Sequence, residues 1–209
     1  MRVLRMALVA FVAALVSAPS ALAERTKPNI SFFSGQQSHA NWTTPDSVDP
    51  NRMSILFDVG PATQIAYAGF VLNHVEGTPP PANEPGFFHK EDRSGQSGGS
   101  PRLVFLFSNG NMYLRPDQWS QSWQEVGNDN DDGNWDVNGG TCTFKFDVTY
   151  AEALQCFPNA LLVNVFMVSD STFLYPTGYL NWIDQLQYSG FTYSHAGDNN
   201  NSQATPPLP

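Results

Sequence analysis

The stretch from Thr141 to Val148 alternates between polar and apolar side chains, and this pattern constrains the fold more than any other feature of the chain. Successive side chains of a β-strand point to opposite faces. The pattern therefore predicts a strand with one buried face, formed by Cys142, Phe144, Phe146 and Val148.

A short helix is expected directly after this strand. Thr149 and Glu152 form a capping box, in which the side chains of both residues bind free backbone amides at the start of a helix. Pro158 ends the segment, so the helix is expected within Thr149–Phe157. It is the one mature segment with a helical signal.

The remaining pattern is that of an all-β protein. The run Leu161–Val168 is apolar at both parities, which predicts a central strand covered on both faces. Asn109-Gly110 between two apolar runs predicts a hairpin. Other strands are expected at 30–33, 52–59, 64–76 and 179–188, the last with Leu180, Trp182, Asp184, Leu186 and Tyr188 on one face. We expect a β-sandwich of jelly-roll type with one short helix.

Residues 1–23 have the form of a secretory signal peptide. Two arginines precede the apolar run Met6–Val16, and Ala21–Ala23 gives a small-x-small cleavage site. The apolar run is too short to span a bilayer. The mature chain is expected to be one domain, 24–195, followed by a disordered polar tail, 196–209. The protein is expected to be secreted, to the periplasm or outside the cell.

Composition excludes two classes of partner. The formal net charge is −9, and the signal peptide carries two of the positive charges. An acidic chain repels nucleic acid and anionic lipid. Charged residues make up 14% of the chain and aromatic residues 13%, a balance found in secreted β-proteins and in proteins that bind sugars.

Cys142 and Cys156 are the two cysteines of the chain. In an oxidising compartment they are expected to form a disulfide, and two buried thiols are the alternative.

Catalytic motifs are weak. Gly95–Gly99 matches Gly-x-Ser-x-Gly, but a nucleophile elbow needs a strand before it and a helix after it, and both flanks are loop. A glycosidase needs two placed carboxylates, and the glutamates show no such arrangement. The sequence therefore favours a non-catalytic protein, while aspartates leave a polysaccharide-active hydrolase or lyase open as an alternative.

Asp184 is an acid at an otherwise apolar parity, so it needs a partner. It could ligate a structural calcium ion together with Asp46 and Asp49, or it could bind backbone amides at a strand end. The acidic loop Asn128–Gly133 lacks the EF-hand pattern, and either calcium or plain solvation is open there.

Tryptophans in loop-like segments are the best candidates for ligand binding. Flat aromatic rings stack on the apolar faces of sugars, and neighbouring amides bind the hydroxyls. The candidate binding residues are Trp119, Trp123, Trp135, Asn128 and Asn134. The alternative is that these tryptophans cap the ends of the sandwich core.

The two ends of the domain resemble jelly-roll carbohydrate-binding modules. Asn29–Gly35, with Trp42 following, is similar to their opening strand, and Asn181–Gln187 to their closing strand. The resemblance implies that Asp184 helps to hold a structural calcium ion. The family usually has a glutamate after the phenylalanine of the opening strand, where this chain has Ser34.

The leading hypothesis is therefore a secreted, non-catalytic β-sandwich that binds a polysaccharide or glycan through loop aromatics. A structural or adhesive extracellular protein that binds another protein is the second hypothesis, and a polysaccharide-active enzyme is the third.

Overall fold

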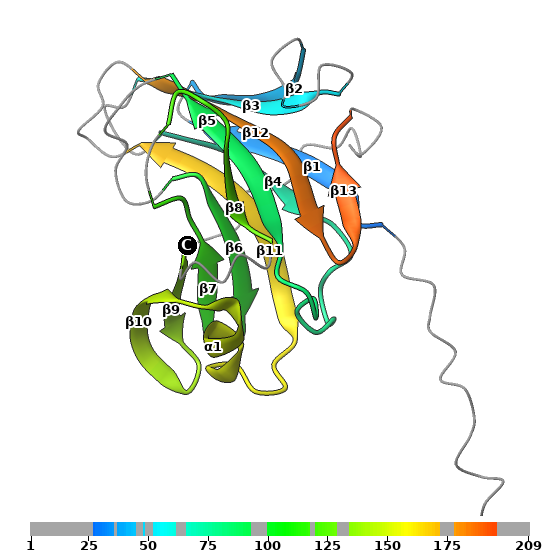
Figure 1. Ribbon diagram of the computed structural model, residues 1–209, viewed down its shortest axis with the longest axis vertical. Helices are drawn as coiled ribbons and strands as arrows, with labels where there is room; N and C mark the ends of the chain where they lie inside the picture. Colours follow the sequence, from blue (N-terminus) through cyan, green and yellow to red (C-terminus); the bar gives the residue numbers. More distant parts are fainter. Residues whose placement is uncertain are drawn as a thin grey trace, which may run out of the picture.

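The chain folds into two antiparallel β-sheets packed face to face, with one short helix at one end (Figure 1). The structure is a computed structural model. It describes residues 27–35, 37–44, 48, 52–61, 66–92, 100–117, 120–128, 134–171 and 178–195. The expected signal peptide and tail lie outside these ranges.

The described residues form the helix α1 (Tyr150–Gln155) and thirteen strands. The strands are β1 (Ile30–Gly35), β2 (His39–Thr43), β3 (Ser54–Val59), β4 (Ala66–Leu72), β5 (Gly86–Glu91), β6 (Arg102–Phe107), β7 (Gly110–Leu114), β8 (Gln124–Gly127), β9 (Trp135–Gly139), β10 (Cys142–Val148), β11 (Leu162–Ser171), β12 (Tyr179–Tyr188) and β13 (Phe191–Tyr193).

The strands divide into a seven-stranded sheet and a six-stranded sheet. The order of the first is β1-β4-β11-β6-β7-β9-β10, and that of the second is β2-β3-β12-β5-β8, with β13 paired to β12. The chain crosses repeatedly between the two sheets, for example from β4 to β5 and back to β6. Such crossings are a feature of jelly rolls. The expected β-sandwich with one short helix is confirmed.

The core lies between the two sheets and is rich in aromatic residues. Phe57 and Phe70 face each other across the sandwich with ring centroids 6.0 Å apart. Phe105 contacts Trp135 at 5.6 Å, edge to face. Trp135 is 0% exposed, and its indole N–H donates to Glu84 Oε1 at 2.6 Å. Burying an indole requires such an acceptor, because an unpaired buried N–H is costly.

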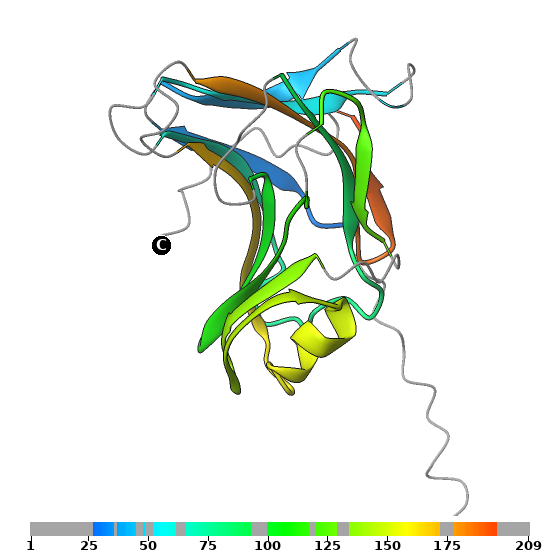
Figure 2. The ribbon, with the colours of Figure 1, turned by 60° about the vertical axis from the view of Figure 1, so that its left-hand side comes forward.

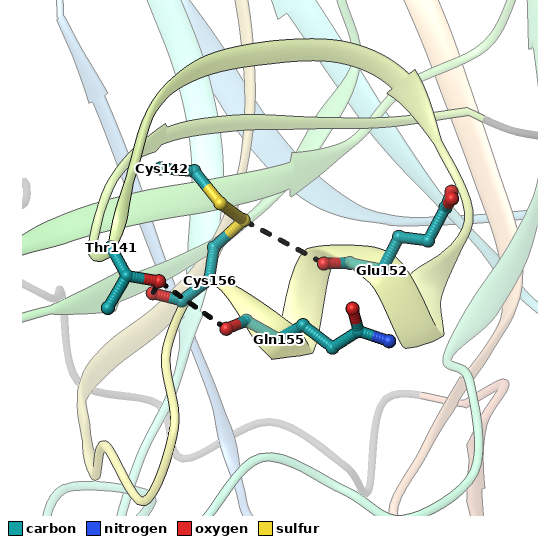
Figure 3. The surroundings of a disulfide bond; sticks show 5 residues. All are labelled: Thr141, Cys142, Glu152, Gln155 and Cys156. Atoms are coloured by element: carbon teal, nitrogen blue, oxygen red, sulfur yellow. Dashed lines mark hydrogen bonds between the residues drawn. A yellow bond between two sulfur atoms is a disulfide. The ribbon is translucent and has the colours of Figure 1, made fainter.

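The helix and its disulfide form where the sequence predicts them. Thr149 Oγ1 accepts from the Glu152 amide, and the Glu152 carboxylate accepts from the Thr149 amide, so the capping box is complete. Cys142 and Cys156 form a disulfide, so the expected pairing is confirmed (Figure 3). The backbone N–H of Thr141 also donates to Cys156 O at 2.7 Å. These contacts tie the start of β10 to the end of α1.

The face prediction for β12 is wrong for half of the strand. Tyr179, Asn181 and Ile183 point inward, whereas Leu180 and Trp182 are partly exposed. Gln185 has a φ of 47°, and the pairing with β5 shifts register between Asp184 and Gln187. This bulge changes the parity, so that Leu186 and Tyr188 return to the core.

Two further expectations need correction. β11 is central, between β4 and β6, but only its inner face is fully covered: Phe166 and Val168 on the other face are partly exposed. β10 has no buried apolar face: Phe144 lies opposite the exposed Asn138 on the outer side of the sheet, and Lys145, opposite the buried Val137, is exposed as well. Within the described ranges, no helix has the length and apolar character needed to cross a bilayer.

Candidate functional site

The outer surface of the seven-stranded sheet is the strongest candidate for a binding site. In Figure 2 this sheet is bent, and the concave side of the bend faces away from the six-stranded sheet. We call this surface the concave face. It consists of the outward side chains of β4, β11, β6, β7, β9 and β10.

One cross-strand row of the concave face is rich in amides. The paired residues are Asn164, Leu106, Asn111, Asn138 and Phe144, each opposite the next on the neighbouring strand. Directly opposed residues of antiparallel strands share one face of the sheet. Leu103, Phe105 and Phe107 of β6 point into the core, so Leu106 and its row point outward.

An exposed pair of phenylalanines ends this row. Phe144 is 46% exposed and Phe146 is 59% exposed, and their ring centroids are 4.4 Å apart, edge to face. Both lie on the same side of β10, because they are two residues apart in a strand. Two large solvent-exposed apolar rings beside amide side chains are typical of a binding surface.

The next row of the concave face combines aromatic and acidic groups. Phe166, Val104, Tyr113 and Asp136 are paired in turn across β11, β6, β7 and β9. Burial, followed by the nearby charge of Asp136 and a hydrogen bond to it, raises the pKa of Tyr113. The Tyr113 phenol therefore stays protonated at neutral pH and remains a hydrogen-bond donor.

Arg115 contacts three aspartates at the edge of the concave face beside β10. Its Nε donates to Asp136 Oδ2 at 2.9 Å, and its two terminal nitrogens contact Asp147 and Asp117. Burial alone would lower the pKa of Arg115, but its bonds and its proximity to Asp136, Asp147 and Asp117 outweigh burial and raise it. Asp147 N also donates to Asp136 Oδ1 at 3.0 Å, so this network fixes the end of β10 that carries Phe146.

A second ion pair lies at the far end of the concave face. Arg102 donates to Asp170, and Ser100 Oγ donates to Asp170 Oδ1. The guanidinium of Arg102 lies 6.0 Å from the ring centroid of Tyr113. The concave face therefore presents aromatic rings, amides and paired charges over several strands, which suits a ligand with hydroxyls and apolar C–H groups.

The structure separates the residues that the sequence groups into a ligand site. Trp135 is in the core and presents no ring face to solvent, so the expected shared tryptophan surface is wrong for this residue. Asn134 is buried as well. Trp123 is partly exposed on the six-stranded sheet, and Trp119 lies outside the described residues. Asn128 donates to Glu125 Oε1 at 2.9 Å.

Asp184 binds backbone amides at a strand irregularity, which is one of the two roles that the sequence suggested for it. It is 2% exposed; its Oδ2 accepts from Val48 N at 2.7 Å and its Oδ1 from Gln185 N at 2.7 Å. Within the described residues, no three His, Cys, Asp or Glu side chains group as metal ligands. Asp46 and Asp49 lie outside those residues. A calcium site at Asp184 therefore stays a prediction.

Sequence reasoning missed the principal residues of the concave face. Phe144 and Phe146 match the pattern of a buried face, and Asn111 reads as a turn residue although it lies in β7. No local signal in the sequence marks these two rings as exposed, because a strand with alternate apolar residues matches the pattern of one buried face.

Comparisons with known proteins give distant structural similarity. The family 11 carbohydrate-binding module of a cellulosomal cellulase of Clostridium thermocellum has a TM-score of 0.44 at 11% identity, over 81% of this chain and 91% of that one. A family 11 carbohydrate-binding module from Clostridium thermocellum in complex with a β-1,3-1,4-mixed-linked tetrasaccharide has a TM-score of 0.43 at 11% identity. The similarity covers 78% of this chain and 89% of that one. The enzymatically active domain of tailspike protein 4 of bacteriophage CBA120 has a TM-score of 0.38 at 13% identity. The similarity covers 74% of this chain and 18% of that one. No protein-family model and no curated protein sequence matches the chain.

Proposed function

We propose that the protein is a secreted, non-catalytic carbohydrate-binding β-sandwich, and that a neutral polysaccharide binds along the concave face. The observation that carries the proposal is the exposed Phe144–Phe146 pair at the end of the row of asparagine amides. The rings offer apolar surface to the C–H faces of sugars, and the amides of Asn111 and Asn138 can both donate to and accept from hydroxyls.

The charges on this face support recognition and not catalysis. Asp136 and Asp147 bind Arg115, and Asp170 binds Arg102. A glycosidase instead needs a protonated acid opposite a second free carboxylate. Ion-paired aspartates accept hydrogen bonds from their arginines and hold the face in a fixed geometry, which lowers the entropy lost on binding.

The test is retention on insoluble polysaccharides and in affinity gels that contain soluble ones, using cellulose, xylan, mannan and mixed-linkage β-glucan. Replacing both rings, Phe144→Ser with Phe146→Ser, should weaken binding about ten-fold or more, because each ring gives up roughly 1 kcal/mol of apolar burial. Val48→Ser is the matched control, since it removes an exposed apolar side chain that lies beside Asp184 and the six-stranded sheet.

Two outcomes would contradict the proposal. Retention that is equal in the double variant and in the wild type would place binding elsewhere. Release of reducing ends from a retained polysaccharide would show catalysis. If none of the polysaccharides is retained, the alternative of an adhesive protein with a protein partner is favoured.

A further inference from the structure

A second group of aromatic side chains lies on the outer face of the six-stranded sheet. Trp182 of β12 is opposite Lys90 of β5 in the strand register. Trp123 directly precedes β8, whose pairing of Gln124 with His89 brings Trp123 beside Lys90. The Lys90 ammonium lies 4.9 Å from the Trp182 ring centroid and 5.3 Å from that of Trp123. We call these three residues the tryptophan–lysine row.

The fold does not need these rings for its core. Their neighbours in sequence, Asn181, Ile183 and His89, point inward and are buried, whereas the residues of the row are partly exposed. Indole rings that remain in contact with water on the outer face of a sheet are enriched at binding surfaces. The two rings come from different segments, and the shared lysine holds them in one group through cation–π contacts.

The chemistry of the row selects a particular ligand. An indole face packs against the C–H face of a pyranose ring, and the ammonium between the two indoles attracts an anionic group carried by that ring. We propose that the tryptophan–lysine row binds a uronic acid residue of a polysaccharide, with the pyranose ring on an indole and its carboxylate at Nζ of Lys90. This second glycan site is independent of the concave face, because it lies on the other sheet.

Acidic residues on both sides of the row limit the charge density of the ligand. Asp92 is two residues from Lys90 on the same side of the strand, and its Oδ1 accepts from Leu180 N at 2.9 Å. Glu125 is opposite Phe88, one row away on the other side. With these carboxylates and a net charge of −9, densely charged polymers are repelled. An isolated uronate among neutral sugars is the ligand that fits.

The experiment compares two disaccharides of one linkage, cellobiose and cellobiouronate, by calorimetry and by tryptophan fluorescence. The wild type should bind cellobiouronate about three- to five-fold more tightly, the range of an exposed ion pair, and the preference should fall at higher salt. Lys90→Met keeps the apolar stem and should remove the preference. Trp182→Ala should weaken binding of both sugars.

The matched control is the Phe144→Ser, Phe146→Ser double variant, which should keep the preference for the uronate. Circular dichroism and thermal unfolding check that each variant is folded, and Lys90→Gln replaces Lys90→Met if the latter is not. The inference is overturned if the wild type binds neither disaccharide or binds both equally, if the Lys90 variant keeps the preference, or if the phenylalanine variant loses it. None of these outcomes bears on retention of neutral polysaccharides by the concave face.

Discussion

Breaking the disulfide between Cys142 and Cys156 should lower the free energy of unfolding by about 3 kcal/mol. The two cysteines are 14 residues apart in the sequence, and closing a loop of this length removes that amount of conformational freedom from the unfolded chain in the loop-entropy model. For a chain of this size, each kcal/mol changes the midpoint of thermal unfolding by about 2–4 °C. The midpoint should therefore fall by roughly 6–12 °C.

The assay is urea and thermal unfolding of the oxidised protein, of the reduced protein and of the Cys142→Ala, Cys156→Ala double variant. Two routes to the same broken bond are needed, because Cys156 is buried and its replacement also changes packing. Reductant should leave the double variant unchanged, which is the control for effects of the reagent on other residues.

If the midpoint of thermal unfolding falls by less than about 2 °C by both routes, this reasoning is refuted. The disulfide would then not restrict the conformational freedom of the unfolded chain as the loop-entropy model requires. The disulfide also anchors the strand that carries Phe144 and Phe146. Reduction below the unfolding temperature should therefore speed amide exchange in β10 and weaken retention on any polysaccharide that the concave face binds.

Three further outcomes are expected. Burial raises the pKa of Glu91. The stability that this carboxyl group contributes is therefore fully present below its unfolded-state pKa and is lost as the pH rises through its folded-state pKa. Glu91→Gln should stabilise the protein at neutral pH and flatten the dependence of its melting temperature on pH. Gly69→Ala would place a Cβ in steric overlap with the Met167 carbonyl oxygen and should cost about 1–3 kcal/mol in urea unfolding, whereas no cost would mean that β4 can shift. Trp135→Phe removes the donor to Glu84 and should cost about 1–3 kcal/mol at neutral pH, a loss that should shrink at low pH if the buried carboxylate causes it.

Local signals in the sequence predicted the parts of the fold that depend on neighbours in the chain. The capping box at Thr149 marks the start of α1, and the Asn109-Gly110 pair marks the β6–β7 hairpin. The alternation in β3 identifies its inner face, since Ile55, Phe57 and Val59 are all buried. Each of these features is fixed by capping, turn geometry or strand periodicity within a few residues.

The candidate binding surfaces could not be predicted in this way, because side-chain parity assumes a regular strand inside a sheet. Trp182 has the parity of Leu186 in the sequence, yet the bulge at Gln185 places the first outside and the second inside. Phe144 has the parity of a buried residue, yet its pairing with Asn138 places it on the outer side of the sheet. Which face of a strand points outward is decided by the register in which the strand pairs with its neighbours.

Two strand irregularities lie beside the proposed binding surfaces. A residue with positive φ in the middle of a strand is strained and weakens a sandwich unless other contacts hold it. At Gln185 the carboxylate of Asp184 accepts from the Gln185 amide, and at Asp147 the network of Arg115 and Asp136 holds the backbone. Buried acids thus hold two of the places where the described strands depart from regular alternation, and large aromatic rings remain exposed or partly exposed beside each of them.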